Sequence, residues 1–219
     1  MMKAMILAGG WEGHTPRETA RILAEAMKAK GIEAEISYSL DPLSDSERLK
    51  SLDLIVPLWT MGQMTDQQWK SLEGAVRGGV GIAGVHGGMC DAFRANLGYQ
   101  WMTGGQFVEH PYVGRYIVRL TAGAYPLLRG IPRRFPYESE QYYMQVDPGN
   151  TILADTVYRL DGRRVIMPVV WTKKWGQGRV FFSALGHNAA ELEKFPVAVE
   201  IAARGMAWAA KGKAAARSR

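Results

Sequence analysis

The residues best suited to chemistry in this 219-residue sequence are its four histidines, His14, His86, His110 and His187. Each falls in a segment expected to be a loop or the end of a strand, and none lies in a stretch with a helical pattern. An imidazole can accept a proton, donate one or bind a metal ion near neutral pH. Functional side chains concentrate in loops on a rigid scaffold, so this placement predicts that the histidines gather around one cleft.

His86 has the most specific surroundings. The apolar run Val80–Val85 leads into it, and Gly84 and Gly88 complete a G-x-H-x-G spacing. The same spacing around serine or cysteine makes a strained strand-to-helix turn that exposes a nucleophile, because small flanking residues permit the tight backbone. Histidine does not form the stable acyl-enzyme of such chemistry. The pattern therefore predicts that His86 transfers protons or binds a metal.

His187 and Glu140 complete the predicted catalytic set. His187 follows the last apolar run, and Glu140 stands in an expected strand beside aromatic residues. Burial among such neighbours would raise the pKa of the Glu140 carboxyl towards the range of a general base. Two imidazoles and a carboxylate can bind a divalent metal such as Zn or Mn, with His86 and His187 as ligands, or can move protons without a metal. Both versions stay open.

A second group of residues is predicted to bind substrate. Aromatic rings at strand ends can stack on sugar rings, although such rings are more often part of a core. His14 precedes a helix start and could be a solvent-exposed neighbour of the cap, and His110 precedes a proline that could aim it outward. The predicted substrate-binding residues are His14, Trp59, His110, Tyr142 and Trp171, with Trp11 and Trp101 as further candidates for stacking.

The elements that would position these residues alternate between strand and helix in the first half. The expected strands are Lys3–Ala8, Ile32–Ser39, Asp53–Trp59 and Val80–Val85. The intervening helices begin with capping-box patterns, Thr15 with Glu18 and Thr65 with Gln68. This alternation is typical of a parallel sheet, in which ligands bind beyond the carboxyl ends of the strands.

The sequence of the second half predicts short strands joined by turns. Residues 104–111 are expected to be a loop, residues 173–178 a hairpin connection, and Phe195–Ala210 a final helix. The expected strands are Arg115–Leu120, Glu140–Val146, Ile152–Arg159, Val165–Trp171 and Arg179–Leu185. The predicted fold class is therefore α/β, with a mostly parallel central sheet flanked by helices and extra antiparallel strands in the C-terminal half.

Composition limits the partners. Four basic residues lie in the last nine positions, and without them the net charge of +6 falls to +2, too little for a nucleic-acid surface. We expect a single domain over residues 1–210 and a basic, disordered tail over 211–219. No apolar run reaches the roughly 20 residues needed to span a bilayer, so we expect no membrane association. The possibility of a homodimer stays open.

The only cysteine is Cys90, so no internal disulfide is possible and a reducing, cytoplasmic location is expected. Cys90 lies four residues past His86, in the helix expected after the turn. We interpret it as a small buried filler, because it is displaced from the apex of the turn.

The ordered set of motifs resembles the ThuA-like proteins of the trehalose-utilisation family, whose fold is similar to that of flavodoxin and the class I glutamine amidotransferases. The resemblance covers residues 3–208. One departure is Ser139, where the family usually carries an acidic residue, so a role that needs two adjacent carboxylates is not implied. The matching pieces are the Gly9-Gly10 loop ending in His14, residues 84–87, 104–107 with His110-Pro111, Glu140 with Tyr142, 168–171, and 176–181 leading to Gly186-His187.

The resemblance implies carbohydrate metabolism, with a disaccharide or keto-sugar as the small-molecule partner. Three functions follow. The first is an enzyme that uses His86, His187 and Glu140 for proton transfer, with or without a metal. The second is a non-catalytic sugar-binding or regulatory module. The third is an amidotransferase-like hydrolase, which the histidine at the apex of the turn argues against.

Overall fold

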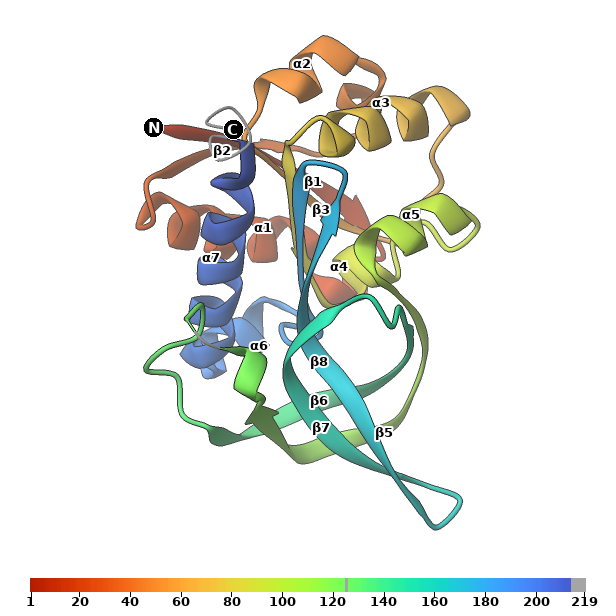
Figure 1. The fold of residues 1–219 in the computed structure, drawn as a ribbon, viewed down its shortest axis with the longest axis vertical. Coiled ribbons are helices and arrows are strands. Elements are labelled where there is room, and N and C mark those ends of the chain that lie inside the picture. The colour runs from red at the N-terminus through yellow and green to blue at the C-terminus, as the bar shows by residue number, and fades with distance from the viewer. Residues whose placement is uncertain (125, 214–219) are drawn as a thin grey trace.

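A single mixed sheet forms the centre of the molecule (Figure 1); the computed structural model describes residues 1–124 and 126–213. Within the described residues, nine strands follow the order β2-β1-β3-β4-β9-β8-β7-β5-β6. The strands are β1 (Met2–Gly10), β2 (Ile32–Ser37), β3 (Leu54–Thr60), β4 (Gly81–Val85), β5 (Gly105–Leu120), β6 (Arg134–Val146), β7 (Thr151–Leu160), β8 (Arg163–Trp175) and β9 (Gly178–Ser183). The helices are α1 (Pro16–Lys28), α2 (Ser46–Ser51), α3 (Asp66–Arg77), α4 (His86–Cys90), α5 (Leu97–Thr103), α6 (Ala189–Lys194) and α7 (Pro196–Ala210), with short 3-10 turns η1 (Glu12–His14), η2 (Asp41–Ser44) and η3 (Ala122–Ala124).

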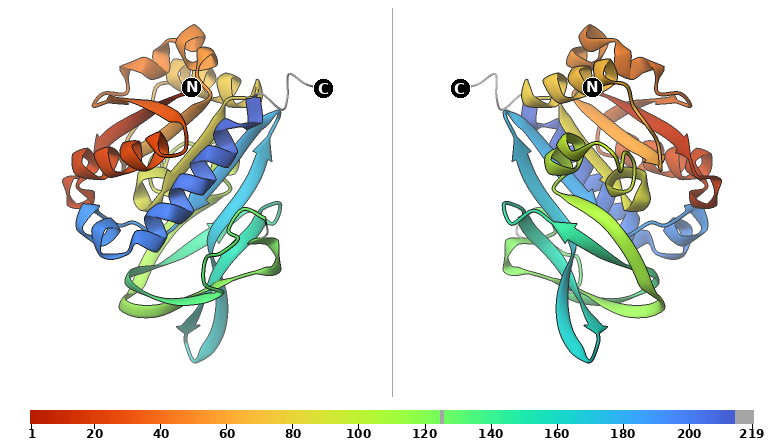
Figure 2. Two further views of the ribbon diagram at one scale, coloured as in Figure 1. Left: turned by 90° about the vertical axis from the view of Figure 1, so that its left-hand side faces the viewer. Right: turned by 90° about the vertical axis from the view of Figure 1, so that its right-hand side faces the viewer.

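The sheet has a parallel half and an antiparallel half, which confirms the predicted fold class. Strands β2, β1, β3, β4 and β9 pair in parallel, whereas β8, β7, β5 and β6 continue the sheet with antiparallel pairs. Helices α1 and α7 pack side by side on one face of the parallel half, and α3 and α5 lie on the other (Figure 2). Coverage on both faces explains why β4 is buried along its whole length.

Helix α7 lies very close to the sheet, and glycine makes this possible. A Cβ atom on Gly205 would fall 2.3 Å from the ring of Phe181 in β9. Both the ring and the helix face are fully buried. Close packing of this helix holds β4 and β9 side by side, and these two strands lead to His86 and His187.

The two predicted capping boxes have different outcomes. At α3, the Thr65 side chain accepts a hydrogen bond from Gln68 N, and the Gln68 side chain accepts one from Thr65 N, as predicted. At α1, Thr15 precedes the helix but makes no side-chain cap, so that prediction is wrong. Thr15 has a φ of 43° and accepts a hydrogen bond from Ala189 N at 2.9 Å, because the loop after His187 packs against it. This contact ties the His14 and His187 loops together.

Two other expectations change. Residues 104–111, predicted as a loop, are mostly the first part of β5, and register shifts between 107 and 112 interrupt the pairing with β6. These irregularities hide the period-2 pattern of a strand. At the other end of the chain, Lys213 Nζ donates to the carbonyls of Lys50 and Leu52, so residues 211–213 pack on the body. The remainder of the predicted tail, 214–219, lies outside the described residues.

Candidate metal centre

His86 stands at the bend predicted between β4 and α4. Its φ is 47°, in the left-handed region, which costs a residue other than glycine roughly 1–3 kcal/mol. Small neighbours make the bend possible, since a Cβ atom on Gly87 would lie 2.6 Å from the His14 ring. The residue is only 1 % exposed and does not line the cleft beside it, so its side chain does not project into a cleft as the turn pattern predicted. Its ring packs instead among those of His14, Tyr142 and His187.

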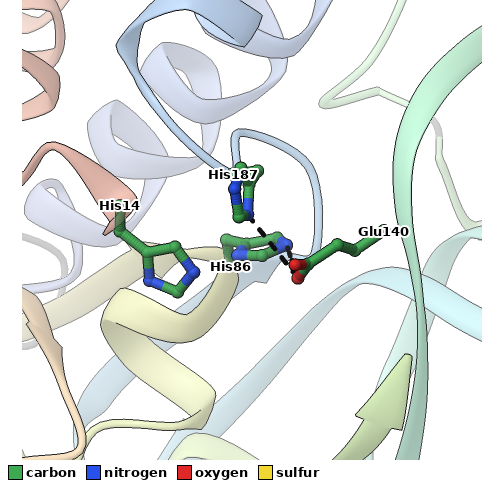
Figure 3. Close-up of side chains that lie close together, drawn as sticks. All are labelled: His14, His86, Glu140 and His187. Carbon is green, nitrogen blue, oxygen red and sulfur yellow. Dashed lines mark ion pairs between the residues drawn. The ribbon is translucent and has the colours of Figure 1, made fainter. Parts of the chain in front are cut away.

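Four side chains from four elements converge at this point (Figure 3). His14 ends η1 after β1, His86 follows β4, His187 follows β9, and Glu140 reaches in from β6. One potential ligand atom from each lies within 4.8 Å of all the others. The carboxyl ends of the parallel strands supply the imidazoles, whereas the antiparallel half supplies the carboxylate.

Hydrogen bonds orient two of the rings. His14 Nδ1 hydrogen-bonds to Thr60 Oγ1 at 2.7 Å, and His86 Nδ1 to Tyr142 Oη at 2.8 Å. These bonds leave Nε2 of each ring for another partner. Nε2 of His86 is buried without a hydrogen bond and lies 3.6 Å from Glu140 Oε2. A buried nitrogen of this kind normally has a partner, and an oriented imidazole with a free nitrogen is typical of a metal ligand.

The backbone at His187 is held in place by the Glu191 carboxylate. Glu191 Oε1 accepts hydrogen bonds from Gly186 N and His187 N, both at 3.0 Å, and from Tyr137 Oη at 2.5 Å. The backbone of this loop turns at Gly186, whose φ of 93° suits glycine. His187 Nδ1 then faces Glu140 Oε2 at 3.5 Å, buried and without a hydrogen bond. It is the second unpaired nitrogen that points into the cluster.

The electrostatics keep two of the imidazoles neutral. Burial, reinforced by repulsion from His187, lowers the pKa of His14 to about 4. Burial and the neighbouring His14 and His187 also place the pKa of His86 well below its ordinary value. Neutral imidazole is the form that binds metal, so these two residues are ready to act as ligands.

Glu140 and His187 shift each other's pKa in the opposite sense. Burial by itself would raise the pKa of Glu140, but the adjacent His187, followed by the charges of His110 and His14, outweighs it and lowers the pKa. Burial would lower the pKa of His187, but the Glu140 carboxylate raises it, with a further contribution from Glu191. The predicted rise in the pKa of Glu140 is therefore wrong, because the interaction with His187 outweighs the effect of burial.

A cleft of about 180 Å³ opens beside the cluster. His110, 42 % exposed on its side chain, stands in its wall with Nε2 3.6 Å from Glu140 Oε1. Arg94 also lines it, held by both carboxylate oxygens of the buried Asp91. The lining residues are Trp11, His14, Thr60, Met61, Asp91, Arg94, Phe107, His110, Glu140 and Tyr142.

The family profile described as ThuA, trehalose utilisation, matches residues 3–209. The chain belongs to the ThuA family. No curated protein sequence matches it. Similar solved structures include a ThuA-like protein of Parabacteroides merdae, which is 19 % identical with a TM-score of 0.75, the alignment covering 97 % of this chain and 91 % of that one.

Two further structures share the fold of this ThuA protein. A cytoplasmic protein of Salmonella typhimurium is 12 % identical with a TM-score of 0.64, over 97 % of this chain and 99 % of that one. The glutaminase domain of Trypanosoma brucei CTPS, solved with acivicin, is 12 % identical with a TM-score of 0.55, over 98 % and 94 % of the two chains. At these identities the likeness concerns the fold alone.

Among the residues predicted to bind substrate, His14 and Tyr142 belong to the cluster and its support, and His110 lines the cleft. Trp171 does not fit its predicted role, because it is fully buried, packs on Phe182 and donates to Thr103 O. Trp59 does not line the cleft, since its ring is packed against Gly9 and Gly62.

Trp11, a further candidate for stacking on a sugar, is 46 % exposed and lines the cleft, where Trp59 and Trp171 were expected. Trp101 is also exposed but borders a different hollow. Cys90 is buried at the end of α4, as expected.

Sequence reasoning missed several supporting residues of this ThuA protein. Thr60 orients His14, Glu191 holds the His187 loop, and Arg94 with Asp91 brings a guanidinium to the cleft. Thr60 directly follows the predicted strand Asp53–Trp59 and is the last residue of β3, so its position at a strand end is a usable signal. Glu191 offers none for this role, because its partners are Tyr137, far away in sequence, and backbone groups of a loop whose path depends on tertiary packing.

Proposed function

We propose that this ThuA-family protein is a metal-dependent enzyme that acts on a disaccharide or keto-sugar. The observation that carries the proposal is the cluster of His14, His86, His187 and Glu140, with two buried imidazole nitrogens that lack a partner. Histidine and carboxylate ligands in this number suit Zn or Mn. A neutral pair of imidazoles, each fixed through its other nitrogen, suits such an ion.

The ligand set is larger than the sequence suggested. Nε2 of His14 and His86, Nδ1 of His187 and an oxygen of Glu140 would hold the ion. A divalent metal bound there would polarise a carbonyl or hydroxyl oxygen of a sugar and make the adjacent carbon more acidic. In this proposal His86 and His187 are ligands, and the role of moving protons passes to side chains that a substrate can reach.

His110 is the best placed of those side chains. Its imidazole is exposed in the cleft, and its Nε2 faces the Glu140 oxygen that is turned away from His86 and His187. A carboxylate in that position orients the ring for proton transfer. His110 would therefore take a proton from the carbon or hydroxyl next to the sugar carbonyl and return it elsewhere, as in an isomerisation or elimination.

The rest of the cleft suits a sugar. Trp11 offers an exposed ring beside His14, and stacking on aromatic faces is a common way to hold a pyranose. Arg94 is fixed by Asp91 through two of its nitrogens, which leaves other N–H groups for substrate hydroxyl or carbonyl oxygens. The cleft has room for about one sugar ring.

The test starts from protein purified without chelator. We expect about one Zn or Mn ion per chain by elemental analysis, and loss of that ion in His86→Ala. Incubation with keto derivatives of disaccharides in D₂O should give deuterium exchange next to the carbonyl by NMR, and His110→Ala should abolish the exchange while it retains the metal. Stoichiometric metal without exchange or turnover of any sugar would favour the non-catalytic module; protein that binds no metal would contradict the proposal.

The amidotransferase alternative has no support in the site. The apex of the turn is His86, and burial raises the pKa of the Cys90 thiol well above its ordinary value, away from the cleft lining. A thiol in that state is a poor nucleophile.

Among the described residues, no helix has the length and apolar character to cross a bilayer. A single buried thiol is consistent with the cytoplasmic location that we propose.

A further inference from the structure

A second hollow lies on the antiparallel half, behind the candidate metal centre. It is a groove of about 620 Å³ between β5 with β6 on one side and β7 with β8 on the other. The two sites are adjacent in sequence: Glu140 of β6 belongs to the candidate metal centre, and Gln141, the next residue, lines this groove. We call it the arginine groove, because Arg115, Arg119, Arg134, Arg159 and Arg164 line it.

The groove exists because two neighbouring strands separate. Strands β5 and β7 pair only at Val118 with Thr156, Arg119 with Asp155, and Leu120 with Ala154. Beyond Thr156 the Gln141 side chain inserts and donates to Thr156 Oγ1 and Val157 O. The facing edges of both strands then diverge without pairing to each other, and side chains take the place of the partner strand: Thr156 Oγ1 donates to Ile117 O, and Tyr112 Oη donates to Arg115 O.

The arginines face one another across paired strands. Arg119 lies directly opposite Arg134 in the β5–β6 register, and Arg159 lies directly opposite Arg164 in the β7–β8 register. Like charges in directly opposed positions destabilise a sheet. Arg119 is neutralised by Asp155 at 2.6 Å. Arg134, Arg159 and Arg164 are exposed, and the described residues provide no carboxylate for any of the three within ion-pair distance.

Apolar side chains lie between these arginines. Ile117 on β5 lines the groove and is 40 % exposed. Ile166 on β8, 59 % exposed, lies outside the lining but directly opposite Val157, which lines the groove. Both isoleucines share the sheet face of the arginines on their own strands by the period of two. A small inorganic anion would leave this apolar surface in water. A second copy of this chain docked by the same face would place arginine against arginine, which disfavours a two-fold contact.

From the groove's shape, the opposed arginines and the exposed isoleucines, we propose that the arginine groove binds an extended, acidic segment of a partner protein. The segment would lie along the groove and bind through its side chains, with carboxylates on the arginines and apolar side chains on Ile117 and Ile166. This site takes no part in the proposed sugar chemistry and does not depend on it.

The probe is a fluorescent nine-residue peptide, Glu-Thr-Val-Thr-Glu-Thr-Val-Thr-Glu, whose glutamates and valines share one face when it is extended. Fluorescence anisotropy with the full-length protein should show saturable binding that weakens at least tenfold between 50 mM and 500 mM salt, because charge pairs at a surface are screened. The same peptide with lysine in place of glutamate should not bind.

The matched variants are Arg159→Glu/Arg164→Glu in the groove and Arg21→Glu/Lys28→Glu on the outer face of α1, which change the net charge equally. The groove variant should weaken peptide binding at least tenfold and the α1 variant less than twofold, with circular dichroism and unfolding temperature as folding checks. If the glutamate variant misfolds, Arg159→Gln/Arg164→Gln provides the same comparison.

Three outcomes would overturn the proposal. These are no peptide binding, equal loss in the α1 variant, and binding of a single-stranded oligonucleotide or tripolyphosphate to the groove with no binding of the peptide. A change of oligomeric state in the groove variant by analytical ultracentrifugation would show instead that a second copy occupies this face. Metal content should stay the same in all variants, so failure here leaves the proposed function untouched.

Discussion

The two halves of the sheet contribute to the candidate metal centre in different ways. The parallel half supplies His14, His86 and His187 from loops at the carboxyl ends of three strands. The antiparallel half supplies Glu140 and the supporting Tyr142 from the middle of β6. The three histidines come together because the carboxyl ends of parallel strands meet at one edge of the sheet. The position of Glu140 depends instead on the path of β6, which brings the middle of that strand to the histidines. The comparison suggests that one half forms the site and the other completes it.

The largest effect should come from a ligand of the parallel half. His86→Ala removes a buried nitrogen at the centre of the cluster, and we expect bound metal to fall from about one ion per chain to nearly none, with sugar turnover reduced at least 1,000-fold. Elemental analysis and deuterium exchange measure the two losses. The control is His110→Ala, which should lose turnover and keep the metal. Equal metal loss in both variants would contradict the assignment of roles.

The next prediction uses pH to separate the two halves in metal-free protein. The folded-state pKa of His14 is about 4, against 6.5 for an ordinary histidine. Between these values the unfolded chain binds the extra proton, so acidification should lower the free energy of unfolding, by up to about 3 kcal/mol for His14 alone. Urea unfolding between pH 7 and pH 4 measures the slope, and His14→Gln should reduce it.

His187 acts in the opposite direction and in another pH window. Because Glu140 raises its pKa, its contribution to stability is fully present below pH 6.5 and is lost as the pH rises through the folded-state value. Glu140→Gln should remove this part of the profile and leave the acid slope of His14 in place. A profile in which both parts vanish together would show that the two halves do not act separately.

The sequence predicted the parallel half well and the antiparallel half less well. The glycine pattern around His86 specifies a bend that any local reading detects, and the capping box at Thr65 specifies a helix start. The aromatic neighbours of Glu140 mark it in the sequence, but they do not predict its lowered pKa, because the histidines that lower it lie far away in sequence.

Tertiary packing also decides the positions that were predicted wrongly. The Thr15 side chain does not cap α1, because its hydroxyl accepts a hydrogen bond from Ala189 N in the loop after His187. Trp171, at the expected strand end, became part of the core because β8 runs on to Trp175 and its inner face is covered. No local pattern in the sequence distinguishes these cases, since each depends on a segment far along the chain.

A smaller effect should come from the residues that orient the ligands, one from each half. Thr60→Val leaves His14 Nδ1 without a partner, and Tyr142→Phe does the same to His86 Nδ1. Loss of such an outer partner typically lowers metal affinity by roughly 10- to 100-fold. Competition with a fluorescent chelator measures both. If the halves contribute equally to orientation, the two losses should agree within about threefold; a loss confined to Thr60→Val would assign the support of the site to the parallel half.

The smallest effect concerns the rim of the cleft. Trp11 follows β1 in the parallel half, and its ring meets that of His14 edge to face, with centroids 4.7 Å apart. Stacking of a sugar on such a ring is worth roughly 0.5–1.5 kcal/mol beyond the area it buries, so Trp11→Ala should raise the KM for a keto-sugar by about 2- to 10-fold. Metal content should not change, because the ring holds no ligand nitrogen of the cluster.

Trp59→Phe, in the same half but outside the cleft lining, is the control for Trp11→Ala and should leave KM unchanged. A larger rise in KM for Trp59→Phe than for Trp11→Ala would mean that the sugar approaches from the other side of β3 and that the cleft beside Trp11 is not its binding place.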